Sequence, residues 1–223
     1  MAIFNTVYGG EWKWKPWANT LVYYNFDDNW ANWYVTDMSW NWHNLTSWTQ
    51  PTYEQLTSWK YCWVSDWSAR VYWSSFSATS DEFTLLYYIN ITNLSQAGKF
   101  WLMFKWNENF SALYGTGYNP NLTVWNTAWA TGIVGWLNPT VNTWYHFCVV
   151  GNKTENTCKV YVNWTLSGTD TYNQSWWTLQ IYLFGSNAWD NCKCKLDEVI
   201  LENKAWSLDE ITKYYNSTKA NYS

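Results

Sequence analysis

The fold is decided by Trp144-Tyr-His-Phe-Cys-Val-Val150 and Cys158-Lys-Val-Tyr-Val-Asn163, two short apolar runs, together with the later run Cys194-Lys-Leu-Asp-Glu-Val-Ile-Leu-Glu202. Alternate residues of a strand point to opposite faces of a sheet, and the first run is largely apolar on both faces. This pattern is typical of a central strand with packed layers on either side. The first two runs are therefore predicted to form a hairpin inside a layered sheet.

A turn at Lys153 fixes the register predicted for this hairpin. The register creates three facing pairs: Cys148 with Cys158, His146 with Val160, and Trp144 with Val162. Two alternatives stay open for Cys148 and Cys158, which are either bridged or free thiols of the core. We favour free thiols, because direct cross-strand disulfides are often strained.

Two further segments follow the hairpin, Lys195-Leu-Asp-Glu-Val-Ile-Leu201 and Ala205-Trp-Ser-Leu-Asp-Glu-Ile211. The order and spacing of these segments and the two hairpin strands form one pattern. With them, residues 143–216 resemble the laminin G-like branch of the concanavalin A-like lectins and glucanases, and the resemblance extends more weakly to residues 21–45. It implies an all-β fold, a two-sheet antiparallel jelly-roll sandwich with one short C-terminal helix. Members of that family mostly bind glycans or other surface ligands.

The chain is predicted to hold one large domain preceded by an arm. Residues 1–20 show no strand or helix period and are interpreted as an N-terminal arm that attaches to a virion partner or a second copy, whereas residues 21–223 form the jelly roll. Short strands are expected at a sandwich-like spacing. They are Leu21–Phe26, a strand ending at Leu45, Tyr61–Trp63, Ala69–Trp73, Glu82–Asn90, Lys99–Lys105, Asn121–Trp125, Thr131–Gly135, Thr178–Phe184 and Lys193–Glu202. The segment Asn107–Pro120 is expected to be a loop, and Ser207-Leu-Asp-Glu210 is a capping box that begins a helix.

Composition excludes several classes of function. Charged residues make up 13% of the 223 residues and the net charge is −4, so no basic surface is expected for nucleic acid or anionic lipid. No apolar stretch is long enough to span a membrane, and Met1–Gly10 does not have the pattern of a signal peptide. Five cysteines and two histidines lack the spacing of a zinc site. The family resemblance implies an extracellular, cell-surface or virion location.

Tryptophan stands at positions where turns are expected. The chain has 23 Trp and 10 Gly, and turn-rich stretches contain Trp40, Trp42, Trp67 and Trp164. Such turns commonly require positive φ, which glycine adopts freely. The family has Ser-Gly-Asn-Gly where this chain has Ser39-Trp-Asn-Trp42, and Asn-Gly where it has Asn163-Trp164.

Three interpretations of these tryptophans compete. They are sugar-stacking platforms, or parts of an aromatic core, or positions that are glycine in an organism whose genetic code reads UGA as glycine. We favour the third, because glycine repairs four turns together. By contrast, Trp144 and Trp206 stand where the family tolerates an aromatic residue.

A glycan site is predicted at the loops on the rim of the sandwich. Aromatic faces stack on sugar rings, and amide groups hydrogen-bond to hydroxyls. The aromatic candidates are Trp106, Tyr114, Tyr118, Trp125 and Trp189, and the amide candidates are Asn107, Asn109, Asn119 and Asn187. The alternative is that these residues reflect only a composition rich in Tyr and Asn.

Calcium is a possible cofactor. Asp27, Asp28 and Asp37 lie in a turn-rich segment and supply the oxygen ligands that calcium prefers, and Asp197 is placed to approach them. Related jelly rolls often hold calcium near such loops. The alternative is that these carboxylates cap backbone amides in turns.

The chain is not predicted to be an enzyme. Glucanases of this fold carry alternate carboxylates on one strand, and Glu198-Val-Ile-Leu-Glu202 has Ile200 where the middle acid belongs. His146 is expected to be a hydrogen-bonded core residue. The predicted function is non-catalytic binding of a carbohydrate or surface ligand, on a bacterial surface or a phage particle. The alternatives are a structural virion or surface-layer protein and, more weakly, a glycoside hydrolase.

Overall fold

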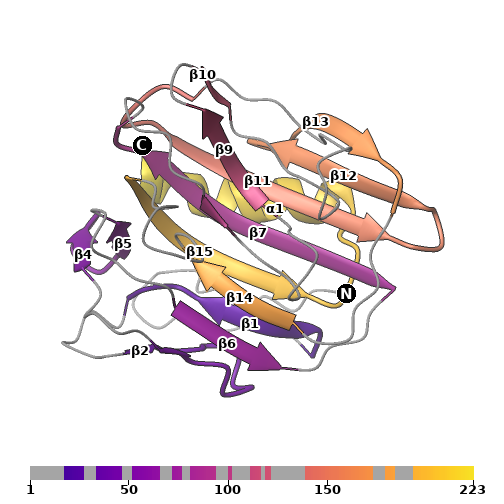
Figure 1. The fold of residues 1–223 in the computed structure, drawn as a ribbon, viewed down its shortest axis with the longest axis horizontal. Coiled ribbons are helices and arrows are strands. Elements are labelled where there is room, and N and C mark those ends of the chain that lie inside the picture. Colours follow the sequence, from indigo (N-terminus) through magenta and orange to yellow (C-terminus); the bar gives the residue numbers. More distant parts are fainter. Residues whose placement is uncertain are drawn as a thin grey trace.

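The computed structural model describes residues 18–27, 34–46, 52–65, 72–76, 81–93, 100–101, 111–116, 119–121, 139–172, 179–183 and 193–223. In these residues the fold is a jelly roll of antiparallel strands with one short helix near the C-terminus (Figure 1). Thr20, predicted to close the N-terminal arm, is the first residue of strand β1. The rest of the predicted arm before residue 18 lies outside the described residues.

The main sheet has eight strands. Seven follow the order β13-β12-β11-β7-β15-β5-β4, and β1 also pairs with β15. Their bounds are β1 Thr20–Tyr24, β4 Thr52–Gln55, β5 Tyr61–Ser65, β7 Glu82–Ile91, β11 Trp144–Asn152, β12 Thr157–Val162, β13 Thr165–Asp170 and β15 Cys194–Glu202. In Figure 1 the long strands β7, β11 and β15 form the centre of this sheet.

Two smaller sheets complete the sandwich. One follows the order β14-β6-β3-β2, with β2 Tyr34–Val35, β3 Leu45–Thr46, β6 Tyr72–Phe76 and β14 Leu179–Leu183. The other follows the order β10-β9-β8, with β8 Phe100–Trp101, β9 Ser111–Thr116 and β10 Asn119–Asn121. Val35 and Leu45 belong to the same buried cluster as Tyr87 and Phe147 of the main sheet, so one core lies between the main sheet and the sheet that contains β2 and β3.

The C-terminal helix covers the opposite face of the main sheet. Helix α1 (Leu208–Thr218) runs behind β7 and β11 in Figure 1, and Ile211 and Tyr214 pack into a second buried cluster with Leu86 and Cys148. The helix begins with the predicted capping box, in which the Ser207 and Glu210 side chains each bond the other's backbone N–H. A 3-10 turn, η1 (Lys219–Tyr222), follows it. Neither helical segment in the described part of the chain could cross a bilayer.

The predicted register of the β11–β12 hairpin is wrong. Cys158 pairs with Gly151, and Cys148 pairs with Tyr161. The difference is three residues, an odd number, so the two cysteines lie on opposite faces of the sheet and in different cores. Cys148 and Cys158 are both free and buried.

Most predicted strands are present, with boundaries that differ by a few residues. The central strands β7, β11 and β15 are confirmed. The prediction of a loop at Asn107–Pro120 is wrong, because β9 and β10 pair there with Thr116 opposite Asn119. The predicted strands Asn121–Trp125 and Thr131–Gly135 lie outside the described residues, apart from Asn121, which ends β10.

Candidate functional site

The predicted glycan-binding residues fall almost entirely outside the described residues. This applies to Trp106, Asn107, Asn109, Tyr118, Trp125, Asn187 and Trp189. Tyr114 was predicted in a loop, but it lies in β9, where it pairs with Asn121 of β10. Asn119 is the first residue of β10. The glycan site therefore stays a prediction.

Asp37, one of the predicted calcium ligands, organises a loop that we call the Trp40 loop, residues 37–43. Its carboxylate accepts hydrogen bonds from the backbone N–H groups of Tyr23, Ser39 and His43, at 3.0, 2.9 and 3.0 Å. The Ser39 hydroxyl also donates to it, at 2.8 Å. A carboxylate with four donors holds the chain in a tight turn and fastens it to β1.

Asn41 fastens the same loop a second time. Its side-chain amide donates to the backbone oxygens of Thr20 and Leu21, at 2.7 and 3.1 Å. The alternating residues Ser39, Asn41 and His43 therefore make the polar contacts of the loop. The residues between them have left-handed backbone, with φ of 73° at Trp40 and 63° at Trp42. Their side chains are 82% and 86% exposed.

Two more predicted calcium ligands, Asp27 and Asp197, contact a lysine, whereas Asp28 lies outside the described residues. The Nζ atom of Lys60 lies 3.5 Å from Asp27, 3.2 Å from Asp197 and 2.5 Å from Glu198. In the described part of the chain, no three His, Cys, Asp or Glu side chains are grouped to hold a metal ion. The ammonium of Lys60 thus supplies the positive charge that these carboxylates face.

Three tyrosine hydroxyls surround this ion pair. Tyr23 and Tyr214 donate to Glu198 at 2.8 and 3.0 Å, and Tyr222 donates to Asp197 at 2.9 Å. We call the group the Lys60 cluster, and its members are Tyr23, Asp27, Lys60, Asp197, Glu198, Tyr214 and Tyr222. It joins β1, the segment before β5, β15 and the C-terminal helical segment, so it anchors that segment to the sheet.

Burial and charge act against each other in the Lys60 cluster. Burial by itself lowers the pKa of Lys60, but the carboxylates of Asp197, Glu198 and Asp27 raise that pKa above its ordinary value. Burial raises the pKa of Asp197, and Lys60 offsets part of that rise. Burial and the Glu198 carboxylate raise the pKa of both Tyr23 and Tyr214, which stay neutral donors.

Glu198 stands at an irregularity in β15. The register of β15 against β7 shifts between Asp197 and Ile200, and Glu198 has φ of 50°. This bulge turns the Glu198 side chain toward Tyr23 and Tyr214. Sequence analysis missed Lys60, and the signal that could have revealed it is two adjacent acids inside an apolar strand, which need a nearby cation.

The second carboxylate of the glucanase-like run is also buried. Glu202 accepts hydrogen bonds from the Thr20 hydroxyl, at 3.0 Å, and from the Trp206 indole N–H. Burial raises the pKa of Glu202, and these two donors offset part of that rise. Glu198 and Glu202 are therefore held by structural partners.

His146 lies inside an aromatic cage. Its ring centroid is 4.8 Å from that of Tyr88, 5.7 Å from Tyr214 and 5.6 Å from Tyr215. The prediction of a core position is confirmed, but the predicted hydrogen bond is wrong, because neither ring nitrogen has a partner among the described residues. Burial lowers the pKa of His146 to about 3, so the ring is neutral.

The turn between β12 and β13 has the geometry of a two-residue hairpin. Val162 pairs with Thr165, and the two residues between them, Asn163 and Trp164, have φ of 46° and 63°. A type I′ turn requires positive φ at both central positions. The indole of Trp164 is partly exposed, with its ring 4.5 Å from Tyr215 and 5.9 Å from the Lys219 ammonium.

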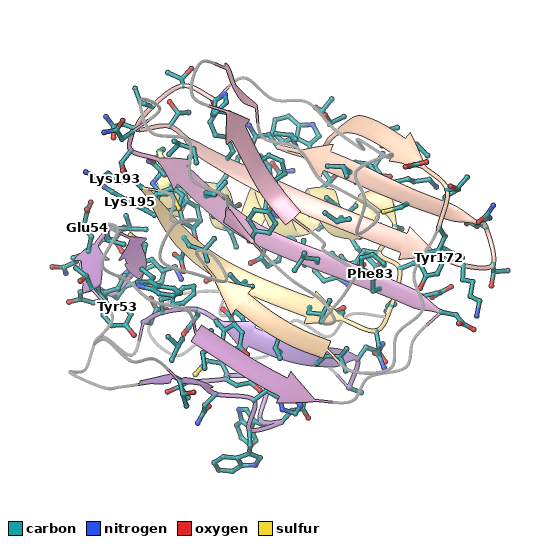
Figure 2. The ribbon with its side chains drawn as sticks, in the orientation of Figure 1. Tyr53, Glu54, Phe83, Tyr172, Lys193 and Lys195 are labelled. Carbon is teal, nitrogen blue, oxygen red and sulfur yellow. The ribbon has the colours of Figure 1, made fainter. Side chains whose placement is uncertain are left out.

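The ends of the main sheet differ in character (Figure 2). Glu54 and Lys195 lie at one end, where they form an ion pair at 2.5 Å. Phe83 and Tyr172 lie at the other, with ring centroids 6.3 Å apart. This ion pair and this ring contact thus lie at opposite ends of the described part of the main sheet.

Comparison with known proteins decides the family. A laminin G-like model described as the concanavalin A-like lectin/glucanases superfamily matches residues 65–212, more than half of the chain. The chain belongs to this superfamily. A search of curated proteins found no match.

Solved structures share the lectin-like fold at low sequence identity. Domain 4 of AbnA, an extracellular arabinanase from Geobacillus stearothermophilus solved with arabinotriose, has a TM-score of 0.66 and 17% identity, over 87% of this chain and 97% of that one. A structure from work on botulinum neurotoxin type C, whose cell entry depends on two ganglioside molecules, has a TM-score of 0.65 and 12% identity. The binding domain of Paraclostridial Mosquitocidal Protein 1 has a TM-score of 0.62 and 15% identity.

The lectin-like chain corresponds to one portion of the toxin structures. The alignment covers 89% of this chain in both cases, but only 51% and 52% of the two toxin chains. The chain therefore spans about half the length of those toxin chains.

Proposed function

We propose that this lectin-like domain is a non-catalytic carbohydrate-binding module that acts outside the cell, at a bacterial surface or on a phage particle. The observation that carries the proposal is the match to 97% of the arabinanase domain that was solved with arabinotriose. The correspondence covers a whole binding domain, whereas the toxin matches cover about half of theirs. An extracellular enzyme domain and two toxin structures as neighbours support an extracellular site of action.

The state of the acidic residues supports a non-catalytic role. A glycosidase needs two carboxyl groups that reach the same sugar. Glu198 is bound by Lys60, Tyr23 and Tyr214, and Glu202 by Thr20 and Trp206. Both side chains are buried, so this strand offers no pair of acids to a ligand.

The proposed ligand contacts are the rim aromatics and amides predicted from the sequence: Trp106, Asn107, Tyr114, Tyr118, Trp125, Asn187 and Trp189. A flat aromatic face provides apolar contact to a sugar ring, and neighbouring amides bond its hydroxyls. Calcium at Asp27, Asp37 and Asp197 is a secondary proposal that rests on the sequence alone, because Lys60 pairs with Asp27 and Asp197 and Asp37 holds its own loop. Calorimetric titration of the purified chain with calcium alone tests it.

Glycan-array binding tests the proposed function. The purified chain is applied to an array that includes arabino-oligosaccharides and gangliosides, and we expect retention of one defined class of sugar. Tyr118→Ala is expected to weaken that binding at least about fivefold, if stacking on a sugar ring contributes as much as stacking on a nucleic-acid base, about 1–3 kcal/mol. The control is Trp59→Ala, because Trp59 is an exposed aromatic outside the predicted site.

Two outcomes would contradict the proposal. Absence of any retained sugar, together with formation of a regular assembly in light scattering, would favour a structural virion or surface-layer protein. Release of reducing ends from a polysaccharide, abolished by Glu198→Gln in a chain that still folds, would establish a glycoside hydrolase.

A further inference from the structure

Three exposed tryptophans occupy backbone conformations that are characteristic of glycine. We propose that Trp40, Trp42 and Trp164 stand at UGA codons that the source cell reads as glycine. The sequence pattern extends the same assignment to Trp67, which lies outside the described residues. This proposal does not depend on the proposed function.

The Trp40 loop requires left-handed backbone at two positions. Ser39, Asn41 and His43 turn inward to the Asp37 carboxylate, the Ser39 hydroxyl and β1. Between these inward contacts the chain bends at Trp40 and Trp42, which have left-handed backbone, with φ of 73° and 63°. Glycine adopts such φ values readily, whereas in tryptophan the Cβ atom comes too close to backbone atoms at these values.

The β12–β13 turn also requires positive φ. Asn163 and Trp164 both have positive φ, as a type I′ turn requires. Asn-Gly is among the strongest sequences for this turn, and asparagine is already present at the first position. Glycine in place of Trp164 therefore completes the preferred pair.

The other left-handed residues in the described part of the chain have an explanation. Asn142, Asn156 and Asn163 belong to the residue type that tolerates this region best after glycine. Phe26 and Glu198 are buried, and packing or hydrogen bonds hold them in place. Neither explanation applies to Trp40 and Trp42, because tryptophan does not favour left-handed backbone and their side chains are almost wholly exposed.

Three other tryptophans in the described part of the chain have ordinary backbone. Trp63 and Trp206 are buried, and neither has positive φ. Trp59 is 38% exposed and also lacks positive φ. The unfavourable backbone therefore marks particular positions, as expected if two different codons were translated as one amino acid.

The genetic code supplies the link between the two amino acids. UGA differs from the tryptophan codon UGG in one base and is a stop signal in the standard code, so a gene with internal UGA codons needs a cell that reads UGA as an amino acid. Reading as tryptophan and reading as glycine both give a full-length chain. The left-handed backbone at three positions, and only 10 Gly beside 23 Trp, favour glycine.

The two other interpretations, an aromatic core and sugar-stacking platforms, do not explain both the exposure and the positive φ of these tryptophans. Trp40 and Trp42 cannot be core residues, because they are exposed. Sugar-stacking platforms would explain exposure but not the backbone, since an indole can be presented equally well from a residue with negative φ. Glycine explains both the exposure and the positive φ.

The decisive experiment reads the codons and the native protein together. Sequencing of the source DNA should find TGA, the UGA codon, at positions 40, 42 and 164 and TGG, the UGG codon, at positions 63 and 206. Peptide mass spectrometry of protein isolated from the source cell should find glycine at the first three positions. UGG codons or native tryptophan at positions 40, 42 and 164 would overturn the proposal.

A stability comparison tests the structural basis in the recombinant chain. At positions 40, 42 and 164, the Trp→Gly variant should have a folding equilibrium constant about threefold above that of the Trp→Ala variant, because only the alanine keeps a Cβ atom at positive φ. At Trp59 the order should be reversed, since glycine there only adds flexibility. Use of alanine as the reference removes the effect of losing the indole, including the contact of Trp164 with Tyr215. Alanine variants at least as stable as the glycine variants at all three positions would contradict the proposal.

Discussion

The ammonium of Lys60 lies 3.2 Å from each carboxylate oxygen of Asp197, and both side chains are buried. Glu198, the next residue of β15, and Asp27, which follows β1, approach the same ammonium. A buried charge without its partner keeps its full desolvation cost, so each partner depends on the others.

Lys60→Met should therefore destabilise the protein strongly. Methionine fills similar space but leaves the carboxyl groups of Asp197 and Glu198 without a cation, at an expected cost of about 3–5 kcal/mol in the free energy of unfolding. Urea unfolding measures the loss. The control is Lys153→Ala, which breaks an exposed pair with Asp81 and should cost less than about 1 kcal/mol. Equal costs for the two variants would show that the buried cluster is not stabilising.

The free energy of unfolding should decrease as the pH is lowered, because His146 is buried in its neutral form. Burial lowers the pKa of His146 to about 3 from 6.5, so the unfolded chain binds a proton in this range while the folded chain does not. The contribution of the neutral ring is complete above about pH 6.5 and is lost as the pH falls toward 3, by about 4–5 kcal/mol in all.

The variant His146→Phe isolates this effect. Burial also raises the pKa of Asp27, Asp197 and Glu202, which act in the opposite sense because the folded chain binds their protons more readily. These groups remain in the variant, so its stability should fall less between about pH 6.5 and 4 than that of the parent chain. Parallel pH profiles of unfolding would contradict the assignment.

Asp37→Ala should loosen the Trp40 loop. The substitution leaves the N–H groups of Tyr23, Ser39 and His43 without their acceptor, and we expect a loss of about 3 kcal/mol. Asp37→Asn keeps one carbonyl oxygen and should recover part of the loss. Thermal unfolding measures both, and hydrogen exchange at residues 39 and 43 should rise in the alanine variant. An unchanged exchange rate at those amides would exclude the anchoring role.

Gly151→Ala should produce a clash at one end of β7. A Cβ atom at Gly151 would lie 1.9 Å from the ring of Phe83, which is itself buried. Overpacking of this kind costs about 1–3 kcal/mol. In a chain that already carries Phe83→Leu, the same substitution should cost less, and a double-mutant cycle of urea unfolding measures the difference. An equal cost in both chains would show that Phe83 is not the obstacle.

Tyr222 should contribute through both its ring and its hydroxyl. The ring stacks on Tyr88 with centroids 3.8 Å apart, and the hydroxyl donates to Asp197. Tyr222→Phe removes only the hydrogen bond and should cost about 1–2 kcal/mol, while Tyr222→Ala should cost about 3–5. Chemical unfolding of the two variants separates the effects, and equal losses would assign the whole contribution to the hydroxyl and contradict a role for the ring.

The central strands could be predicted from the sequence because burial on both faces leaves a continuous apolar run. The same is true of the helix, whose capping box is a local signal. The register of β11 and β12 could not be predicted in this way. Gly151 and Asn152 look like turn residues but extend β11, and the turn occupies residues 153–156, with Asn156 at φ of 53°. A polar exposed edge strand such as β13 gives no alternating pattern either.

The candidate sites were less predictable than the fold. Asp27 and Asp197 were identified as a pair of acids facing a cation, but a lysine distant in the sequence is the cation. Asp37 was grouped with them only because turns are rich in acids, and it serves its own loop. Positive φ at Trp40, Trp42 and Trp164 could be predicted, because a turn that needs positive φ can be recognised from its neighbouring residues.

The Lys60 cluster also bears on how the chain folds during synthesis. Its members extend from Tyr23 to Tyr222, so the ribosome must translate nearly all of the intervening residues before the last hydroxyl donor emerges from the exit tunnel. Until then the acids of β15 have an incomplete set of partners, and the nascent sandwich should remain open to chaperones and proteases.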